Sequence, residues 1–332
     1  MKKKMLIIMV LSGILTTFLS MSYAESTVSK SMVPLPPSLK NLPTIKVEPW
    51  LQLECGDAFL EGPAFDRLGN LFVSSIDDGS ILKITPDKKI ITILKQDGLL
   101  PDGIAIHKDG RLFLACLSGN IVAVNPDGTG LTYINVKYHG FPKAVNDLVF
   151  DSKGNLYITG FSGTPANPSG CVYRYSSDFK EIKPVYGNLA AANGIALAPE
   201  GNVLWVSEMC RNTLNRIELE EDGITVKPMA GASIACRFTG SPGGCDSMAV
   251  DIDGNIYQAI YLQGRILVLN NMGIPIANVL IPGRDEGKLL HSTNVAFKPG
   301  TDEVYITVSG DGGAWIYNFK GLATGLELYS HQ

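Results

Sequence analysis

The sequence has few histidines and no cysteine motif that would suit a structural transition metal. It contains four histidines and six cysteines in 332 residues. The histidines lack the spacing of a helical or hairpin pair, and no Cys-x-x-Cys occurs, which excludes a zinc ribbon and a thioredoxin motif. A bound zinc ion is therefore disfavoured.

Several other signatures are missing. No Lys/Arg-rich block follows the first four residues and the net charge is −4, so the electrostatic footprint of a nucleic-acid binder is absent. The segment Gly-Phe-Ser-Gly at 160–163 is one residue short of a nucleophile elbow, and no Gly-x-x-x-x-Gly-Lys loop occurs. These absences disfavour a serine hydrolase and a nucleotide enzyme.

The N-terminus is typical of a secretory signal. Three lysines at 2–4 precede an apolar run at 5–19 and the small-residue site Ser22-Tyr23-Ala24. The run is shorter than the roughly 20 residues of a spanning helix, so a retained anchor is the weaker alternative. We predict a signal peptide at 1–24, a mature chain from Glu25 that is periplasmic or secreted, and no membrane attachment after cleavage.

An exported chain can form disulfides. Cys236 and Cys245 flank one short loop, and we predict a bridge between them. The pairing of the other four cysteines does not follow from sequence, and small buried hydrophobes are an equal alternative for Cys55, Cys116, Cys171 and Cys210.

The chain after the signal repeats one unit six times. Each unit has a polar residue, a short apolar run, a tight turn and a second run. The units start at Glu61, Asp102, Asn146, Asn193, Asp246 and Thr293. The turn position follows eight residues later in every copy, at Gly69, Gly110, Gly154, Gly201, Gly254 and Thr301. Self-similarity at such a period is typical of propellers and other repeat folds.

Short runs rich in Val, Ile, Tyr and Phe continue each unit, and no amphipathic helix interrupts them. The sequence therefore predicts an all-β fold, a six-bladed β-propeller over 44–332 with four-stranded antiparallel blades around a central channel, preceded by an extended tether at 25–43. Closing the last blade requires a strand from one terminus. Residues 44–53 and 326–329 are both candidates.

The residue that enters each innermost strand must lie near one end of the channel. We therefore expect the starting residues of the six units to form a ring there, which we call the polar ring. Five of them carry carboxylate or amide oxygens, which suit a hard cation such as Ca²⁺. The alternative, that they only bond their own backbone in turns, does not account for Glu61. The Asp-Gly and Gly-Asn pairs are interpreted as hairpin turns, and Asp251-x-Asp253 lacks the later Glu of an EF-hand.

Four strings carry a resemblance: Leu60-Glu61-Gly62-Pro63, Asn146-Asp147, Asn193-Gly194 and Asp246-Ser247. They are similar to the metal-site motifs of the senescence-marker protein, gluconolactonase and luciferin-regenerating-enzyme family of six-bladed propellers, across nearly the whole mature chain. Longer strings, above all Ile-Pro-Gly-Arg-Asp-Glu-Gly at 281–287, resemble the drug-responsive bacterial lactonases of this family.

The resemblance implies a lactonase that depends on calcium or another divalent cation. Glu61, Asn193 and Asp246 would be direct ligands, Asn146 a direct or water-mediated ligand, and Ser247 a further contact. Two departures bear on the substrate. Ala144 replaces an arginine that helps gluconolactonase-like members hold a sugar acid, and Asn146 and Gly160 stand where the drug-responsive lactonases have acidic residues. A sugar lactone is therefore less favoured.

In such a site Asp246 would act as ligand and general base, with Asp102 or Asp147 in reserve. The expected partner is a small-molecule lactone or ester. Two alternatives remain: phosphotriester or other ester hydrolysis at the same site, and an exported calcium-binding propeller without catalysis. Loops at 160–170, 208–213, 233–245 and 284–293 would shape the pocket, with candidate wall residues Tyr261, Phe161, Arg237 and His291.

Overall fold

The computed structural model describes residues 31–53, 58–134, 140–240 and 243–332. The predicted signal peptide and the first part of the predicted tether lie outside these residues, as does Cys55. Among the residues that the structure describes, no helix has the length and apolarity needed to cross a membrane.

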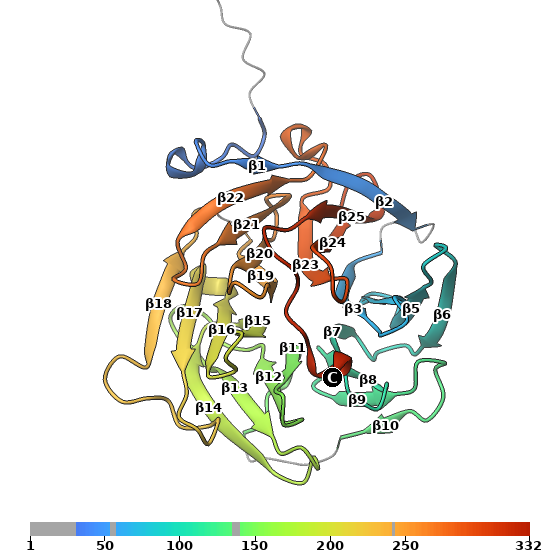
Figure 1. The fold of residues 1–332 in the computed structure, drawn as a ribbon, viewed down its shortest axis with the longest axis vertical. Coiled ribbons are helices and arrows are strands. Elements are labelled where there is room, and N and C mark those ends of the chain that lie inside the picture. The colour runs from blue at the N-terminus through green and yellow to red at the C-terminus, as the bar shows by residue number, and fades with distance from the viewer. Residues whose placement is uncertain (1–30, 54–57, 135–139, 241–242) are drawn as a thin grey trace, which may run out of the picture. The chain divides into compact units, whose positions relative to one another are not determined.

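The described chain forms six sheets in a ring, each with four antiparallel strands, which confirms the predicted six-bladed propeller (Figure 1). Blades 1 to 3 contain β3 (Leu60–Phe65), β4 (Leu71–Ser75), β5 (Ser80–Ile84) and β6 (Ile90–Lys95); β7 (Pro101–Ile106), β8 (Leu112–Cys116), β9 (Ile121–Val124) and β10 (Thr132–Tyr133); and β11 (Val145–Phe150), β12 (Leu156–Gly160), β13 (Gly170–Tyr175) and β14 (Ile182–Leu189).

Blades 4 to 6 follow the same order from the axis outward. They contain β15 (Ala192–Leu197), β16 (Val203–Glu208), β17 (Thr213–Glu218) and β18 (Ala232–Arg237); β19 (Cys245–Val250), β20 (Ile256–Ile260), β21 (Arg265–Leu269) and β22 (Pro275–Leu280); and β23 (His291–Phe297), β24 (Glu303–Ser309), β25 (Ala314–Lys320) and β2 (Val47–Leu53). Four 3₁₀ turns occur in the described chain: η1 (Pro37–Leu39), η2 (Met209–Arg211), η3 (Arg284–Glu286) and η4 (Tyr329–His331).

The N-terminus closes the propeller. Strand β2 pairs antiparallel with β25 as the outermost strand of blade 6, and the preceding β1 (Thr44–Ile45) pairs in parallel with β22 of blade 5. One short segment thus joins two neighbouring blades. Of the two candidates for closure, 44–53 is the one used.

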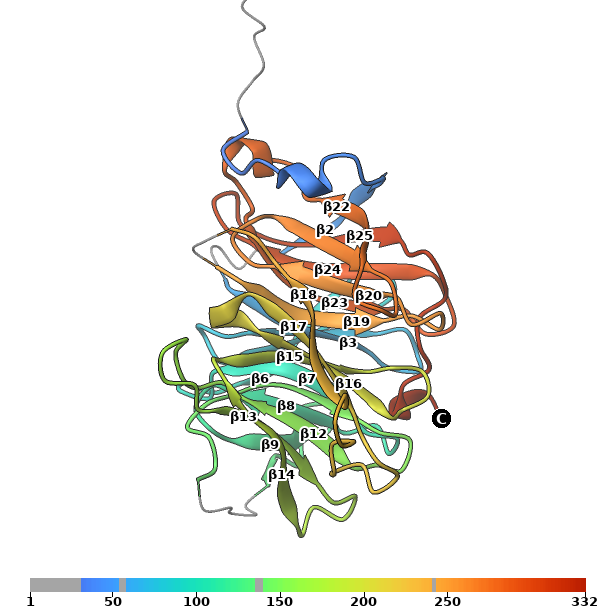
Figure 2. The same cartoon turned by 90° about the vertical axis from the view of Figure 1, so that its left-hand side faces the viewer.

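The C-terminal segment has a different place. It leaves β25 and crosses the centre of the propeller to η4 on one face, as Figures 1 and 2 show. Leu326 N donates to the Val250 carbonyl of blade 5, and Arg67 of blade 1 donates to the carbonyl of Gln332. The tail therefore lies across one end of the channel.

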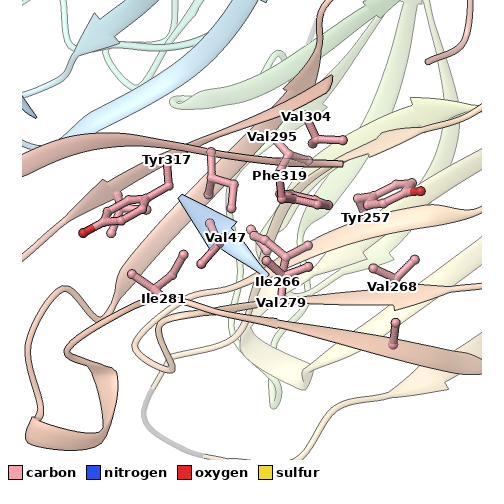
Figure 3. Packing of buried hydrophobic residues seen from close by; sticks show 14 of the residues in the cluster. Val47, Tyr257, Ile266, Val268, Val279, Ile281, Val295, Val304, Tyr317 and Phe319 are labelled. Carbon is pink, nitrogen blue, oxygen red and sulfur yellow. The ribbon is translucent and has the colours of Figure 1, made fainter. Parts of the chain in front are cut away.

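The core is divided among the blades. In the described chain, six apolar clusters lie one between each pair of neighbouring blades. Figure 3 shows the layer between blades 5 and 6, where Val47 of the closing strand packs with Ile266 and Phe319. Burial of apolar surface between blades holds the ring closed, since each blade alone would leave both faces in water.

The turns follow the predicted hairpin chemistry. In blade 1 the Asp66 carboxylate accepts the backbone N–H groups of Leu68 and Asn70, at 2.9 and 2.8 Å, and the Asn70 side-chain amide. Asp151 and Asp251 repeat these contacts in blades 3 and 5. The repeated Asp and Asn are therefore turn residues.

The predicted disulfide between Cys236 and Cys245 is wrong, because both thiols are free. Cys236 lies on β18, the outermost strand of blade 4, whereas Cys245 begins β19, the innermost strand of blade 5. The loop between them carries the chain from the rim to the axis. The Cys245 thiol instead donates to the Glu208 and Thr213 carbonyls of blade 4, both at 3.4 Å.

Candidate functional site

Every innermost strand carries an irregularity at the same end of the channel. From Cys245 to Met248, β19 advances three residues while its partner β20 advances two, from Ile260 to Gln258. Comparable register shifts occur near the start of the other five inner strands. A β-bulge of this kind re-aims side chains and is frequent next to active sites. All six inner strands thus have a bulge at the same end of the channel, where side chains can be re-aimed.

The polar ring lies within these bulges. All six members are buried: Glu61, Asp102, Asn146, Asn193, Asp246 and Thr293. The Asn146 side-chain amide of blade 3 donates to Asp102 Oδ2 of the neighbouring blade 2 at 2.9 Å. The carboxyls of Glu61 and Asp246 are close enough to raise the pKa of Asp102 by repulsion, after the larger effect of burial. The structure therefore brings together the residues that the repeat placed at one end of the channel.

Thr293 has a different role from the other members. Its hydroxyl donates to the Leu60 carbonyl of blade 1 at 2.7 Å and lies 2.8 Å from the Thr307 hydroxyl, so it links blade 6 to blade 1. The next residue, Asn294, donates its amide to Glu61 Oε2 at 2.9 Å. Asn294 was not among the residues predicted from the sequence, although it occupies the same place in its repeat as Asp147 and Ser247 do in theirs.

Asp147 follows the polar-ring residue Asn146 and lies one residue further along β11. Its Oδ1 accepts the N–H of Leu148 at 2.8 Å and its Oδ2 that of Ile195 at 3.2 Å. A Cβ at Gly103 would stand 2.5 Å from Oδ1, so only glycine lets blade 2 approach this carboxylate. Burial raises the pKa of Asp147 to about 6, against the opposing effect of these backbone donors. Asp147 is thus a carboxylate held in place by two blades.

Hydroxyl groups from the second strands brace the polar ring. Ser74 Oγ donates to the Asp102 carbonyl at 2.6 Å, and Ser207 Oγ to the Asp246 carbonyl at 2.7 Å. Thr159 makes the equivalent bond to the carbonyl of Asn193. In each case the donor belongs to the preceding blade. The Gln258 amide adds a second bond to the Asp246 carbonyl, at 2.7 Å. These bonds fix the backbone from which the ring side chains project.

Crowding of buried acids shapes the electrostatics. Burial raises the pKa of Glu61 to about 8, although Gly62 N–H and Asn294 stabilise its charged form. Burial, and next the charge of Glu61, raise the pKa of Asp246 well above its usual range. No described lysine or arginine is among the groups that act on these carboxyls. Without a cation, the site holds protons that free carboxyls would lose at neutral pH.

The donor set fits a hard cation. Three buried oxygens of the polar ring have no hydrogen-bond partner within the described structure, namely Asp102 Oδ1, Asn146 Oδ1 and Asn193 Oδ1. Unpartnered buried oxygens are costly, and Ca²⁺ prefers carboxylate and amide oxygens of this type. Among the described residues, no three histidine, cysteine or carboxylate side chains converge as a metal centre by themselves. A cation here would therefore require the amide oxygens as well.

Aromatic side chains stand near the polar ring. The rings of Tyr261, His291 and Phe59 pack against one another at tilted angles, with centroids 5.0 to 5.9 Å apart. The side-chain amide of Asn193 donates to the sulfur of Met209 in η2, at 3.6 Å. Tyr261 is near enough to Asp246 for that charge to add to the burial that raises the tyrosine pKa. Two predicted wall residues, Tyr261 and His291, are thus brought together. The other two predicted wall residues do not join this cluster. Arg237 is exposed at the end of β18. Phe161 directly follows β12, where its backbone N–H donates to the carbonyl of Ala144.

A cavity of about 240 Å³ extends along the channel behind the polar ring. Asp147 and Asn294 line it, together with apolar residues of the inner strands such as Ile104 and Leu148. The C-terminal residues 325–332 line it too. The tail therefore bounds the channel on the side away from the ring.

A family model for the SMP-30/Gluconolactonase/LRE-like region matches residues 59–310. The chain belongs to this family. A relative named lactonase drp35 from Staphylococcus saprophyticus is 45% identical over 308 residues, which cover 90% of this chain and 94% of the relative. The protein of the same name from Staphylococcus aureus strain MRSA252 is 42% identical over 313 residues, covering 92% and 95%.

Solved structures of proteins with lower sequence identity share the fold. A luciferin-regenerating enzyme superposes with a TM-score of 0.69 at 22% identity, over 85% of this chain and 99% of its own. Regucalcin from Agrobacterium tumefaciens, described as a calcium-binding protein, gives 0.68 at 18% identity, over 86% and 98%. At this level of identity the likeness concerns the fold alone.

Proposed function

We propose that the protein is a lactonase that uses a divalent cation, Ca²⁺ by preference, at the polar ring. The observation that carries the proposal is the pair of buried, unpartnered amide oxygens of Asn146 and Asn193, which lie with the buried carboxyls of Glu61 and Asp246 at one end of the channel. The names of relatives 42 to 45% identical over nearly the whole chain support the reaction class. The same evidence supports a small lactone as the substrate.

Glu61, Asn193, Asp246 and Asn146 would hold the cation, with Ser247 beside them. When bound, a divalent cation supplies Lewis acidity toward an ester carbonyl oxygen. Two carboxylates and two amides compensate its charge without an excess of negative charge. The hydroxyl bonds of Thr159 and Ser207 hold the backbone of the ligands Asn193 and Asp246 in place when their oxygens are desolvated. The bond of Ser74 does the same for the backbone of Asp102.

Lactone hydrolysis also needs a group that takes a proton from water and returns one to the leaving alkoxide. Asp102 is best placed for this role, because Asn146 holds its Oδ2 while its Oδ1 is free in the polar ring. Asp147 is less suited, since backbone donors occupy both of its oxygens. Asp246, the base favoured by sequence, would be engaged as a ligand. We therefore propose Asp102 as the proton acceptor and keep Asp246 as its rival.

The test is a panel of lactones, carboxylic esters and phosphotriesters, assayed with calcium and then with a chelator. We expect lactone hydrolysis that the chelator abolishes and calcium restores. Activity on phosphotriesters alone would favour the other ester chemistry. Calcium binding without turnover on any substrate would favour a binding protein.

Asp102→Asn keeps the acceptor for the Asn146 amide and removes the proton-accepting oxygen. With the variant shown to be folded and calcium-loaded, we expect kcat to fall by roughly 10²–10⁴, as when a general base is lost. Asp87→Asn, at an exposed turn of blade 1, is the matched control and should keep the parent rate. A parent rate in Asp102→Asn would move the role to Asp246.

A further inference from the structure

A second polar feature lies outside the polar ring. Arg265, the first residue of β21, is fully buried. Its Nε donates to Gln263 Oε1 at 3.0 Å, but Nη1 and Nη2 have no hydrogen-bond partner among the described residues. An arginine side chain stays charged in proteins and carries five donors. A buried cation with two unused nitrogens is among the costliest groups that a core can hold.

The position of Arg265 follows from the sheet register. Arg265 pairs with Ile260 of β20, and Ile260 pairs with Cys245 of β19. These residues therefore share one face of blade 5, the face that packs against blade 4 together with Leu267 and Leu269. Cys245 precedes Asp246, so the guanidinium occupies the end of this layer nearest the polar ring, two strands out from the axis. Two strand spacings amount to about 10 Å.

The charges around Arg265 do not balance. A second buried cation, Arg284 of η3, donates its Nε to the Gln263 carbonyl at 3.0 Å and its Nη1 to Asp285 at 2.7 Å. Burial, and next the charge of Arg284, lower the pKa of Arg265 to about 10. Burial raises the pKa of the nearby Cys236 thiol to about 11, so the thiol is neutral. Asp285 pairs with Arg284, and no described carboxylate pairs with Arg265.

We propose that Arg265 forms the centre of a buried site for a small monovalent anion of halide size, between blades 4 and 5. Its Nη1 and Nη2 would donate to the anion, and Arg284 would add attraction. Nη1 and Nη2 have almost no solvent-accessible surface, so the ion must be small, must shed its water and must enter with a local shift of the surrounding side chains. A neutral water molecule could accept the same hydrogen bonds but would leave the charge uncompensated, which is why an anion is favoured.

Such an anion would stabilise the loops beside the polar ring. Gln263 is held by Arg265 at its side chain and by Arg284 at its carbonyl, and its own amide donates to the Thr239 carbonyl at 2.9 Å. Arg284 also donates to the carbonyl of Val33 in the N-terminal segment. One anion would thus secure Thr239 after β18, the β20–β21 hairpin and η3 together. The inference does not depend on the lactonase proposal.

Two measurements on the calcium-loaded parent test the site. Crystals soaked in sodium bromide should show an anomalous peak within hydrogen-bond distance of Arg265 Nη1 and Nη2. In solution, the thermal midpoint should rise with chloride at constant ionic strength, with methanesulfonate as the replaced anion, because an ion bound to the native state stabilises it.

Arg265→Met removes the charge with little change in length and should abolish both the peak and the chloride response. Arg216→Met is the matched control, since Arg216 lies on the neighbouring β17 and pairs with Glu218 at 3.1 Å; it should keep both. If Arg265→Met does not fold, the parent data decide. No bromide peak, or a midpoint equal in both salts, would overturn the proposal. A peak without a chloride response would mean an adventitious ion only, which also overturns it.

Discussion

The buried carboxyl of Glu61 makes a prediction about stability and pH. Its pKa is raised from 4.5 to about 8 in the calcium-free fold, chiefly by burial. Between these values the folded state binds a proton that the unfolded state has lost. Stability must therefore fall as pH rises through this window, by up to about 1.4 kcal/mol per pH unit for one proton. From pH 5 to 8 the change is about 3 kcal/mol, because the slope is smaller near each of the two pKa values.

Glu61→Gln isolates this effect, because it keeps the shape and an acceptor for the Gly62 N–H while it removes the ionisation. The free energy of unfolding, from urea titrations in chelator at pH 5, 6, 7 and 8, should fall less steeply in the variant than in the parent. The histidines of lowered pKa, such as His291, are common to both proteins and cancel in the difference. The pKa values of Asp102 and Asp246 should fall in the variant, because the charge of Glu61 contributes to raising them, and this makes the pH dependence of the variant shallower still.

Calcium should reverse the trend in the parent, because the cation competes with protons for the same oxygens. At one hundred times Kd it should add about 2.7 kcal/mol at a pH where the site is ionised. Equal pH slopes for parent and Glu61→Gln in chelator would refute the reasoning, as would a melting temperature that neither calcium nor chelator changes.

The remaining predictions concern the brace around the polar ring and the covalent state of the chain. Ser207→Ala leaves the Asp246 carbonyl and the Gly194 N–H without the hydroxyl they share. We expect the free energy of unfolding to fall by about 1–3 kcal/mol and calcium binding, measured by calorimetry, to weaken. If both quantities keep their parent values, the bond is dispensable. Non-reducing peptide mapping should find free thiols at Cys236 and Cys245, and a linked peptide would contradict the structure. Intact-mass analysis of protein from the exporting host should give a chain that begins at Glu25, whereas an uncleaved N-terminus would refute the signal.

The repeat in the sequence determined the architecture. Period, strand composition and turn residues are local properties, so six units of one kind predict six similar blades, and the residue entering each unit predicts a ring of side chains. The motifs around Glu61, Asn193 and Asp246 also indicated a cation from local sequence alone, because the residue type determines which ligand atoms a side chain offers.

Contacts between distant residues were decided only in three dimensions. The choice of 44–53 for closure depends on which edge of blade 6 is left unpaired. The disulfide prediction failed because nine residues in sequence carry Cys236 and Cys245 from the rim of one blade to the axis of the next. The pairing of Asn294 with Glu61 joins the last blade to the first.

Charge balance is equally a tertiary property. The sequence gives no sign that Arg265 is buried without a partner, because its neighbours come from blades 4 and 5 and from η3. Likewise, the preference for Asp102 over Asp147 as proton acceptor depends on which oxygens the backbone already occupies. Sequence supplies the groups and their order. Burial and the partners that folding brings to each group decide which of them can bind a cation, accept a proton or hold an anion.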